Sequence, residues 1–469
     1  MIYQRKSKED VILQKKILAI IVVIIIVVAI VAAIQLSMNP VPSADARDIR
    51  IGLVAPISGS PIGQDMERAA RMAVDEINNA GGIHVSGWNT KVNITLVIAD
   101  TVNDAPTNAV TPVTRAVESD KVDLLIGGYG SAGTLANEVV AIENKIPYII
   151  TGASNQLVTR RGPQGDYGGF GASGANSISD ADGMSYMFHY CTTTYHYSKT
   201  VVDFFADEMK PMVAPDRNFS LAILYRNDAF GQGVEQAVKF WIQDEDLPIT
   251  LVADRNYDPA TTNYQTDLTA VATTNPDAVL VVDNPDKSPL IIKQGWNDVG
   301  LKTVYIVIEN NQDQAFYDLI GSTGDGQLLE SRFNPFMTPS YSTAVQVYVE
   351  KFEALYPHMM PGMMGADTYD AFFIAKAAIE RAGTIDKVAV RDALEATNMD
   401  QSLIPTQSGK IEFSKGVNYH EIDPMTFVEQ LKWNAETSHL TSQIVWTPNP
   451  NSNLKQADFT LPTGYQPGQ

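Results

Sequence analysis

The sequence predicts an α/β protein with two doubly wound parallel-sheet lobes and an N-terminal transmembrane helix. Two series of short apolar strands alternate with amphipathic helices, one before residue 160 and one after residue 218. Strands that are apolar along their whole length and alternate with helices form parallel sheets covered on both faces. The roughly 420 residues after the tether are too many for one hydrophobic core and suit two domains.

The transmembrane prediction rests on an apolar run at 17–34, which contains eighteen residues and no charge. A helix of that length spans about 27 Å, close to the thickness of the hydrocarbon core. Segment 1–16 carries five basic and two acidic residues, and the positive-inside rule keeps such a segment in the cytoplasm. We therefore expect a basic cytoplasmic segment (1–16), an anchor (17–34), a tether (35–47) and an exterior ligand-binding part. The protein would be a single-pass protein of the cell membrane.

A cleaved signal peptide is the alternative for this N-terminal region. The sequence Ala44-Asp45-Ala46 has the small-x-small pattern of a cleavage site. The apolar run is longer than a usual signal core, however, and the cleavage pattern lies well beyond its end. The sequence leaves both outcomes open.

Composition excludes several functional classes. The chain has a formal net charge of −20, and the basic first segment makes the remainder more negative still. Nucleic-acid binding needs a basic surface and is disfavoured, while a strongly charged exterior favours a soluble monomer. Cys191 is the single cysteine, so no internal disulfide forms. The sequence contains no nucleophile motif, metal motif or phosphate-binding loop, which predicts no enzyme activity, no cofactor and no metal site.

The first series of elements lies before residue 160. Strands are expected at 49–54, 92–98, 122–126 and 146–150, and helices at 66–77, 107–118 and 135–143. Pro112 must lie in the first turn of its helix or kink it. A glycine-rich segment at 163–185 is expected to be a surface loop, either a flexible insertion or a lid.

The second series begins at residue 219. Strands are expected at 219–225, 249–253, 278–282 and 304–308, and helices at 231–243, 262–274, 287–299 and 313–320. Two long helices at 340–356 and 367–382 follow, and a Pro- and Asn-rich tail at 448–469 is expected to be flexible.

Three loops at the carboxyl ends of the first-lobe strands are rich in Gly, Ser and Thr: 55–65, 127–134 and 151–156. Ligands of doubly wound sheets bind at this edge. Ser131 and Thr134 precede a predicted helix, and helix N-termini attract carboxylates. The sequence thus predicts an anion-binding edge in the first lobe.

Several segments carry a resemblance to a known family: AVDEINNAGGI (73–83), LIGGYGSAGT (125–134), ASNQLVTRRG (153–162), NDAFGQG (227–233) and VGLKTVYIVIEN (299–310). With these, the chain resembles the type I periplasmic binding proteins, specifically the leucine/isoleucine/valine-binding family, over roughly 48–447. The resemblance implies two lobes joined by a three-segment hinge. The expected parts are first lobe 48–190, second lobe 191–332, first-lobe return 333–425 and second-lobe C-terminal part 426–447.

The resemblance also implies a function and a set of site residues. A protein of this family captures an amino acid for an ABC importer and delivers it to the permease. By position, Ser131 and Ser154 would hold the ligand carboxylate, the Gly152 carbonyl would accept from the ligand ammonium, and Glu309 would neutralise that ammonium. The other expected ligand-binding residues are Ala132, Ile62 and Phe230.

Departures from the family pattern leave the ligand side chain open. Ile62 and Phe230 stand where the family often has Tyr, and Asn284 and Pro285 replace aromatic residues after the strand at 278–282. The amino-acid class is therefore better supported than any one amino acid.

Structural roles for the three polar residues remain open at this point. Ser131 would cap its helix, Ser154 would stabilise its own turn, and Glu309 would be solvated or would favour a helix N-terminus. A functional alternative is a ligand-sensing exterior domain working with a signalling partner.

Overall fold

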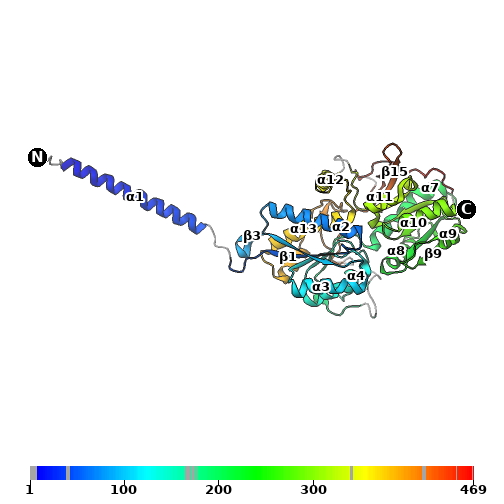
Figure 1. Ribbon diagram of the computed structural model, residues 1–469, viewed down its shortest axis with the longest axis horizontal. Coiled ribbons are helices and arrows are strands. Elements are labelled where there is room, and N and C mark those ends of the chain that lie inside the picture. The colour runs from blue at the N-terminus through cyan, green and yellow to red at the C-terminus, as the bar shows by residue number, and fades with distance from the viewer. Residues whose placement is uncertain are drawn as a thin grey trace.

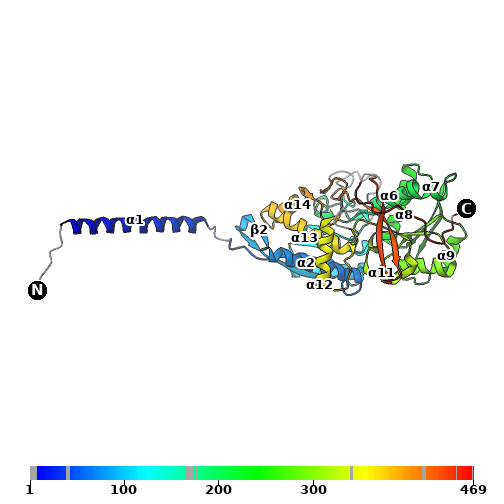
Figure 2. The ribbon, with the colours of Figure 1, turned by 90° about the horizontal axis from the view of Figure 1, so that it is seen from above.

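The computed structural model describes residues 8–38, 43–163, 171, 174, 177–337, 342–414, 419–449, 452–466 and 468. Helix α1 (Lys8–Met38) leads away from two packed lobes that hold the rest of the described chain (Figure 1). Seen from above, the same two lobes lie end to end (Figure 2).

The first lobe is built on a five-stranded parallel sheet in the order β4-β1-β5-β6-β7. Its strands are β1 (Ile49–Ala55), β4 (Ile94–Asp100), β5 (Leu124–Gly127), β6 (Tyr148–Ile150) and β7 (Met187–His189). Successive side chains of β1 point to opposite faces: Leu53 packs in one core cluster and Val54 in the other. Helices α2 (Pro61–Asn79) and α13 (Met363–Ala382) cover one face, and α3 (Pro106–Thr114) and α4 (Ser131–Asn144) cover the other.

The second lobe is built on a seven-stranded sheet in the order β16-β15-β12-β11-β10-β8-β9. The parallel strands are β8 (Phe219–Arg226), β9 (Ile249–Tyr257), β10 (Ala278–Val282), β11 (Val304–Val307) and β12 (Leu328–Ser331). An antiparallel hairpin, β15 (Phe427–Asn434) and β16 (His439–Trp446), completes the sheet. Helices α6 (Thr194–Phe204) and α8 (Ala229–Asp244) cover one face, and α9 (Gln265–Ala272), α10 (Ser288–Lys293) and α11 (Gln314–Ile320) cover the other.

The remaining elements are short or peripheral. They are α5 (Ala181–Met184), α7 (Lys210–Val213), α12 (Thr343–Leu355), α14 (Lys387–Glu395), and the strand pairs β2 (Ile83–Val85) with β3 (Thr90–Val92) and β13 (Met399–Asp400) with β14 (Lys410–Ile411). The chain passes between the lobes between β7 and α6, between β12 and α12, and between β14 and β15.

Several predicted helices differ from the structure at their ends, and two of them show the physical reason. Helix α2 begins at Pro61, earlier than the apolar periodicity suggests, because the Ser60 side chain accepts from the Ile62 N–H and Pro61 occupies the first turn. The helix expected at 107–118 ends at Thr114 and continues as a wider π turn at Arg115–Ser119. Pro112 lies inside α3 and removes one backbone donor.

The prediction of a flexible C-terminal tail is wrong for the part of it that the structure describes. Phe459 is buried and its ring centroid lies 5.3 Å from that of Phe204 in the second lobe. The Gly468 N–H donates to Asp277 at 3.0 Å, and Arg217 donates to the Gly468 carbonyl at 2.8 Å. Composition suggested disorder, but buried contacts with one core hold the segment in place.

The glycine-rich segment at 163–185 is only partly described. Ala181–Met184 forms the short helix α5, whose N-terminus is capped by Asp180, and Met184 is buried in the first lobe. This part is therefore not the surface loop that was expected. Much of the rest of the segment lies outside the described residues, so the choice between insertion and lid stays a prediction.

At the N-terminus, residues 17–34 lie inside α1, as the apolar run predicts. The described large apolar side chains from Ile12 to Val28 are exposed. Within the described residues, no helix meets the combined length and hydropathy that a membrane crossing requires. The predicted anchor is therefore not confirmed.

Candidate functional site

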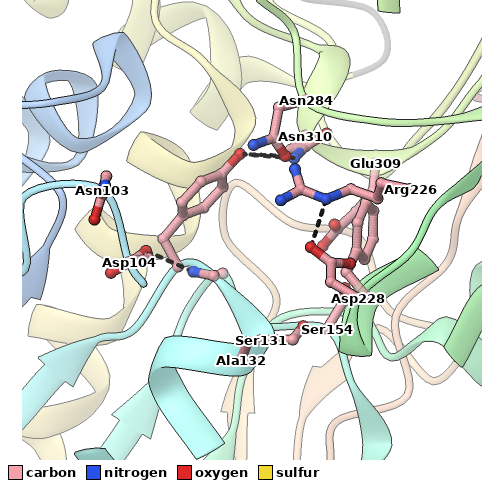
Figure 3. A pocket seen from close by; sticks show the side chains of 14 residues that line it. Asn103, Asp104, Ser131, Ala132, Ser154, Arg226, Asp228, Asn284, Glu309 and Asn310 are labelled. Carbon is pink, nitrogen blue, oxygen red and sulfur yellow. Dashed lines mark hydrogen bonds and ion pairs between the residues drawn. The ribbon is translucent and has the colours of Figure 1, made fainter. Parts of the chain in front are cut away.

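A pocket of about 70 Å³ lies between the lobes, lined by loops at the carboxyl ends of their strands (Figure 3). This is the edge at which open α/β sheets bind ligands. The first lobe contributes eight lining residues: Asn103, Asp104, Tyr129, Gly130, Ser131, Ala132, Gly152 and Ser154. The second lobe contributes six: Arg226, Asp228, Phe230, Asn284, Glu309 and Asn310.

The wall from the first lobe offers two buried hydroxyl groups. Ser131 is the first residue of α4, and its Oγ accepts from the Asn155 N–H at 3.2 Å. Ser154 follows β6 and shares a hydrogen bond of 3.2 Å with the Tyr197 hydroxyl. The helix α4 begins at the pocket, so its positive N-terminal end faces the same space. Together these groups suit a carboxylate.

Gly152 lines the same pocket and is closely packed against the neighbouring backbone. A Cβ atom on this residue would lie 3.1 Å from the Gly128 carbonyl oxygen and 3.1 Å from the Tyr129 Cα. A side chain here would require the neighbouring backbone to move by a few tenths of an ångström. The Gly152 backbone itself borders the pocket.

Glu309 is the acidic residue of the second-lobe wall. It follows β11 with a φ of 54°, a left-handed conformation that is uncommon outside glycine, and its side chain is 2% exposed. Its N–H donates to Glu330 at 3.1 Å, and its carboxylate lies 3.3 Å from Nη1 of Arg332. These contacts hold the carboxylate at the pocket.

Burial raises the pKa of Glu309 to about 7, while Arg332 opposes this shift and Asp367 adds to it. Arg332 also forms a buried ion pair with Asp367. Burial likewise raises the pKa of Glu330 to about 8, so that carboxyl is mostly neutral at neutral pH. Burial also raises the pKa of Asp367 to about 7. Above that pH, where both carboxyls are ionised, one guanidinium faces two carboxylates, which leaves one negative charge for a cationic ligand group to neutralise.

A cluster of polar side chains from both lobes also lines the pocket. The Tyr129 hydroxyl crosses from the first lobe and donates to Oδ1 of Asn284 at 3.2 Å. Nδ2 of Asn310 donates to the Tyr129 hydroxyl at 2.7 Å and to Asn284 at 3.0 Å. Nε of Arg226 donates to Asp228 at 2.6 Å. In Figure 3, the side chains of Arg226, Asn284 and Asn310 lie above Ser131 and Ser154.

The structure brings six of the seven expected site residues to this pocket: Ser131, Ala132, Gly152, Ser154, Phe230 and Glu309. Ile62 is not among them. It is 3% exposed and packs in the core of the first lobe, because the first turn of α2 faces the sheet. The structure therefore does not place Ile62 at this pocket.

The structure also bears on the purely structural roles considered for Ser131, Ser154 and Glu309. The N-cap of α4 is Gly130, and the Ser131 hydroxyl makes no capping bond. Glu309 is buried rather than solvated. The hydroxyl of Ser154 contacts Tyr197, a residue of α6 that is distant in sequence, rather than its own turn. Ligand contact by these residues stays a prediction.

Sequence reasoning missed the partners that complete the site. Arg332 is 1% exposed and pairs with residues from both lobes. Its position directly after the short strand β12, which begins with two leucines, was the available signal. Tyr129 lies inside the quoted segment at 125–134, and Arg226 and Asp228 flank the end of β8. Asn310 ends the quoted segment at 299–310, whereas Asn103 and Asp104 carried no comparable signal.

Comparison with known sequences supports the family resemblance. A family model described as "Periplasmic binding protein" matches residues 48–432. "Leu/Ile/Val-binding protein homolog 8" of Brucella abortus is 24% identical over 323 residues, covering 66% of this chain and 72% of the relative. "Leu/Ile/Val-binding protein BraC3" of Rhizobium johnstonii is 22% identical over 387 residues, covering 82% and 92%.

Solved structures show the same fold. A leucine-binding protein LivK from Thermotoga maritima aligns with a TM-score of 0.67 and 18% identity, covering 85% of this chain and 99% of that one. LivJ from Streptococcus pneumoniae, in complex with isoleucine, aligns at 0.66 and 18%, covering 86% and 100%. A solute-binding protein from R. palustris in complex with benzoate aligns at 0.65 and 18%, covering 86% and 98%. The chain belongs to the periplasmic binding protein family, the type I solute-binding proteins of ABC-type transporters, which are not enzymes.

Proposed function

We propose that this protein captures an α-amino acid outside the cytoplasm and delivers it to the permease of an ABC importer. The observation that supports this most is the placement of two hydroxyls from one lobe and one carboxylate from the other around a single pocket. A zwitterion needs donors for its carboxylate and an anion for its ammonium, and the first lobe supplies the donors while the second lobe supplies the anion.

In the proposed complex, the ligand carboxylate accepts from the hydroxyls of Ser131 and Ser154 and faces the N-terminus of α4. The ammonium donates to the Glu309 carboxylate and to the Gly152 carbonyl. Both interactions form fully only when the lobes are together, so the ligand favours the closed state by its contacts with both lobes.

The first test replaces Glu309 with Gln, which keeps the size and removes the charge. We expect affinity for the zwitterion to fall by about 3–5 kcal/mol, as for one partner of a buried ion pair. Titration calorimetry on the purified chain measures this. The matched control is Asp277→Asn, because Asp277 is a buried carboxyl of the second lobe that pairs with Arg217 at 2.6 Å and does not line the pocket. Equal affinity in the Glu309 variant and the wild type would exclude the ammonium role.

The second test is Ser131→Ala. A hydrogen bond to a charged group contributes about 1.5–3 kcal/mol, and we expect a loss of that size in calorimetry. Ser438→Ala, at an exposed position in the hairpin between β15 and β16, is the control. A loss no larger than in the control would contradict the assignment of the carboxylate to this wall.

Aromatic acids are the second candidate ligands, since a solved relative of the same fold is in complex with benzoate. Benzoate has a carboxylate and no ammonium, so it leaves the buried charge of Glu309 without a partner. We therefore expect alanine or leucine to raise the melting temperature of the chain more than benzoate does at equal concentration. Stabilisation by benzoate alone would favour the aromatic-acid class.

We also propose that the apolar run at 17–34 attaches the protein to the membrane. The support is the uncharged run itself and the exposed apolar side chains described along α1. Flotation of the full chain with phospholipid vesicles tests this, with a chain lacking residues 1–47 as control. Both chains remaining in the dense fraction would contradict the proposal.

A further inference from the structure

The pocket wall contributed by the second lobe is polar where an aliphatic ligand side chain would need apolar contacts. Among the described residues that line the pocket, Ala132 and Phe230 supply apolar side chains and Tyr129 supplies a ring. The surrounding groups are Arg226, Asp228, Asn284, Asn310, Asn103 and Asp104. An aliphatic side chain placed among them would leave buried polar groups without partners, which is strongly unfavourable.

Charge decides which polar side chain fits this wall. Nε of Arg226 donates to Asp228 at 2.6 Å, and Nη1 lies 3.3 Å from the buried carboxyl of Asp283. Two carboxylates therefore face one guanidinium, so it carries no surplus positive charge for a carboxylate side chain. An acidic ligand side chain would also approach Asp228. A cationic side chain would meet the like charge of the Arg226 guanidinium, while the two carboxylates beside it would attract a cation. Binding of L-lysine as tightly as the better amide would therefore also overturn the inference below.

The second-lobe wall still offers a ligand both hydrogen-bond donors and an acceptor. Nη2 of Arg226 and Nδ2 of Asn284 have no hydrogen-bond partner among the described residues. Oδ1 of Asn284 already accepts from Tyr129 and Asn310, which turns its Nδ2 away from them. Oδ1 of Asp228 accepts from a single backbone N–H, that of Gly231. Two free donors and one acceptor with spare capacity thus lie on the same wall.

We infer that this wall selects a neutral side chain ending in a carboxamide. Its carbonyl accepts from Nη2 of Arg226 and Nδ2 of Asn284, and its NH₂ donates to Asp228. The inference rests on the proposed function, since Ser131 and Glu309 hold the α-carboxylate and α-ammonium of the same ligand. It extends that function by naming the class of side chain.

Calorimetry of the full chain with four ligands tests the inference: L-glutamine, L-asparagine, L-glutamate and L-leucine. We expect one of the two amides to bind at least about tenfold tighter than both glutamate and leucine, equivalent to one lost hydrogen bond of about 1.4 kcal/mol. Leucine or glutamate binding as tightly as the better amide would overturn the inference and leave the proposed function standing. Binding of none of the four would overturn both.

Substitutions in the second-lobe wall test whether these residues cause the preference for a carboxamide side chain. Asn284→Ala and Arg226→Met are each expected to weaken binding of the preferred amide at least about tenfold and to leave leucine binding unchanged or tighter. Arg255→Gln is the control, because Arg255 pairs with Asp267 at 2.7 Å in the same lobe and does not line the pocket. If Arg226→Met fails to fold, Asn284→Ala carries the test alone, and an unchanged amide preference in that variant would overturn the inference.

Discussion

At the scale of single residues, the site depends on the way in which neighbours hold Glu309. Its left-handed backbone, the hydrogen bond from its N–H to Glu330 and the approach of Arg332 together keep a carboxylate buried at the pocket. A buried charge is tolerated when it is paired. Because Arg332 is shared with Asp367, the pairing is incomplete until a ligand ammonium arrives.

This arrangement predicts a pH dependence of ligand binding. The pKa of Glu309 is raised to about 7, chiefly by burial, and an ammonium binds the ionised form. Affinity should therefore rise with pH up to about 7 and level off above it. Below that value, affinity should fall by up to about tenfold for each pH unit. Calorimetry from pH 5.5 to 8.5 measures the trend. A flat profile in the wild type, or an unchanged slope in Glu309→Gln, would contradict this account.

At the scale of elements, buried polar contacts join segments that are far apart in the sequence. Arg160, in the loop after β6, forms two hydrogen bonds of 2.7 Å with Glu421, and both side chains are at most 1% exposed. Asp65 in α2 accepts from the N–H groups of Gly362 and Gly365 and so caps α13. These contacts tie the returning first-lobe segments to the sheet.

Replacing Glu421 with Gln tests the first of these contacts. It removes the negative charge that faces the buried Arg160 guanidinium, which should lower the free energy of unfolding by about 3–5 kcal/mol. Denaturant unfolding monitored by circular dichroism measures the change. The control is Asp120→Asn in the exposed pair with Arg115, where we expect less than about 1 kcal/mol. Similar losses in the two variants would show that burial does not decide the strength of this pair.

The strands and helices were largely predictable because hydrophobic periodicity is a local signal. The hairpin of β15 and β16 was not predicted as strands, because its partner is β12, about a hundred residues earlier, and such pairing leaves no local trace. The same limit applies to the site. Ser131 and Glu309 were found at strand ends, whereas the Tyr129–Asn284 and Glu309–Arg332 contacts depend on how the chain folds back.

At the scale of the whole molecule, the two lobes are connected directly across the pocket. The Tyr129 hydroxyl reaches Asn284 and Asn310, and Nδ2 of Asn155 donates to the Ala229 carbonyl at 2.7 Å. The structure is thus that of a closed or nearly closed pair of lobes. A ligand adds contacts to both walls and shifts the equilibrium further toward closure.

Several buried carboxyls give the molecule a further pH dependence. Burial raises the pKa of Asp65, Glu309 and Asp367 to about 7 and that of Glu330 to about 8. Such groups hold a proton more tightly in the folded state, so their stabilisation is complete below about pH 4 and is lost as pH rises through 7 to 8. The ligand-free chain should melt at a higher temperature at pH 5.5 than at pH 8. A melting temperature that rises over this range would contradict the burial of these groups.

The most direct test of the central claim is a crystal structure of the chain with its tightest-binding amino acid. The account predicts the ligand between the lobes, with its ammonium within about 3.2 Å of the Glu309 carboxylate and its carboxylate at the same distance from the Ser131 hydroxyl. Density for the ligand outside this pocket, or a ligand turned so that its ammonium faces Ser131, would contradict it.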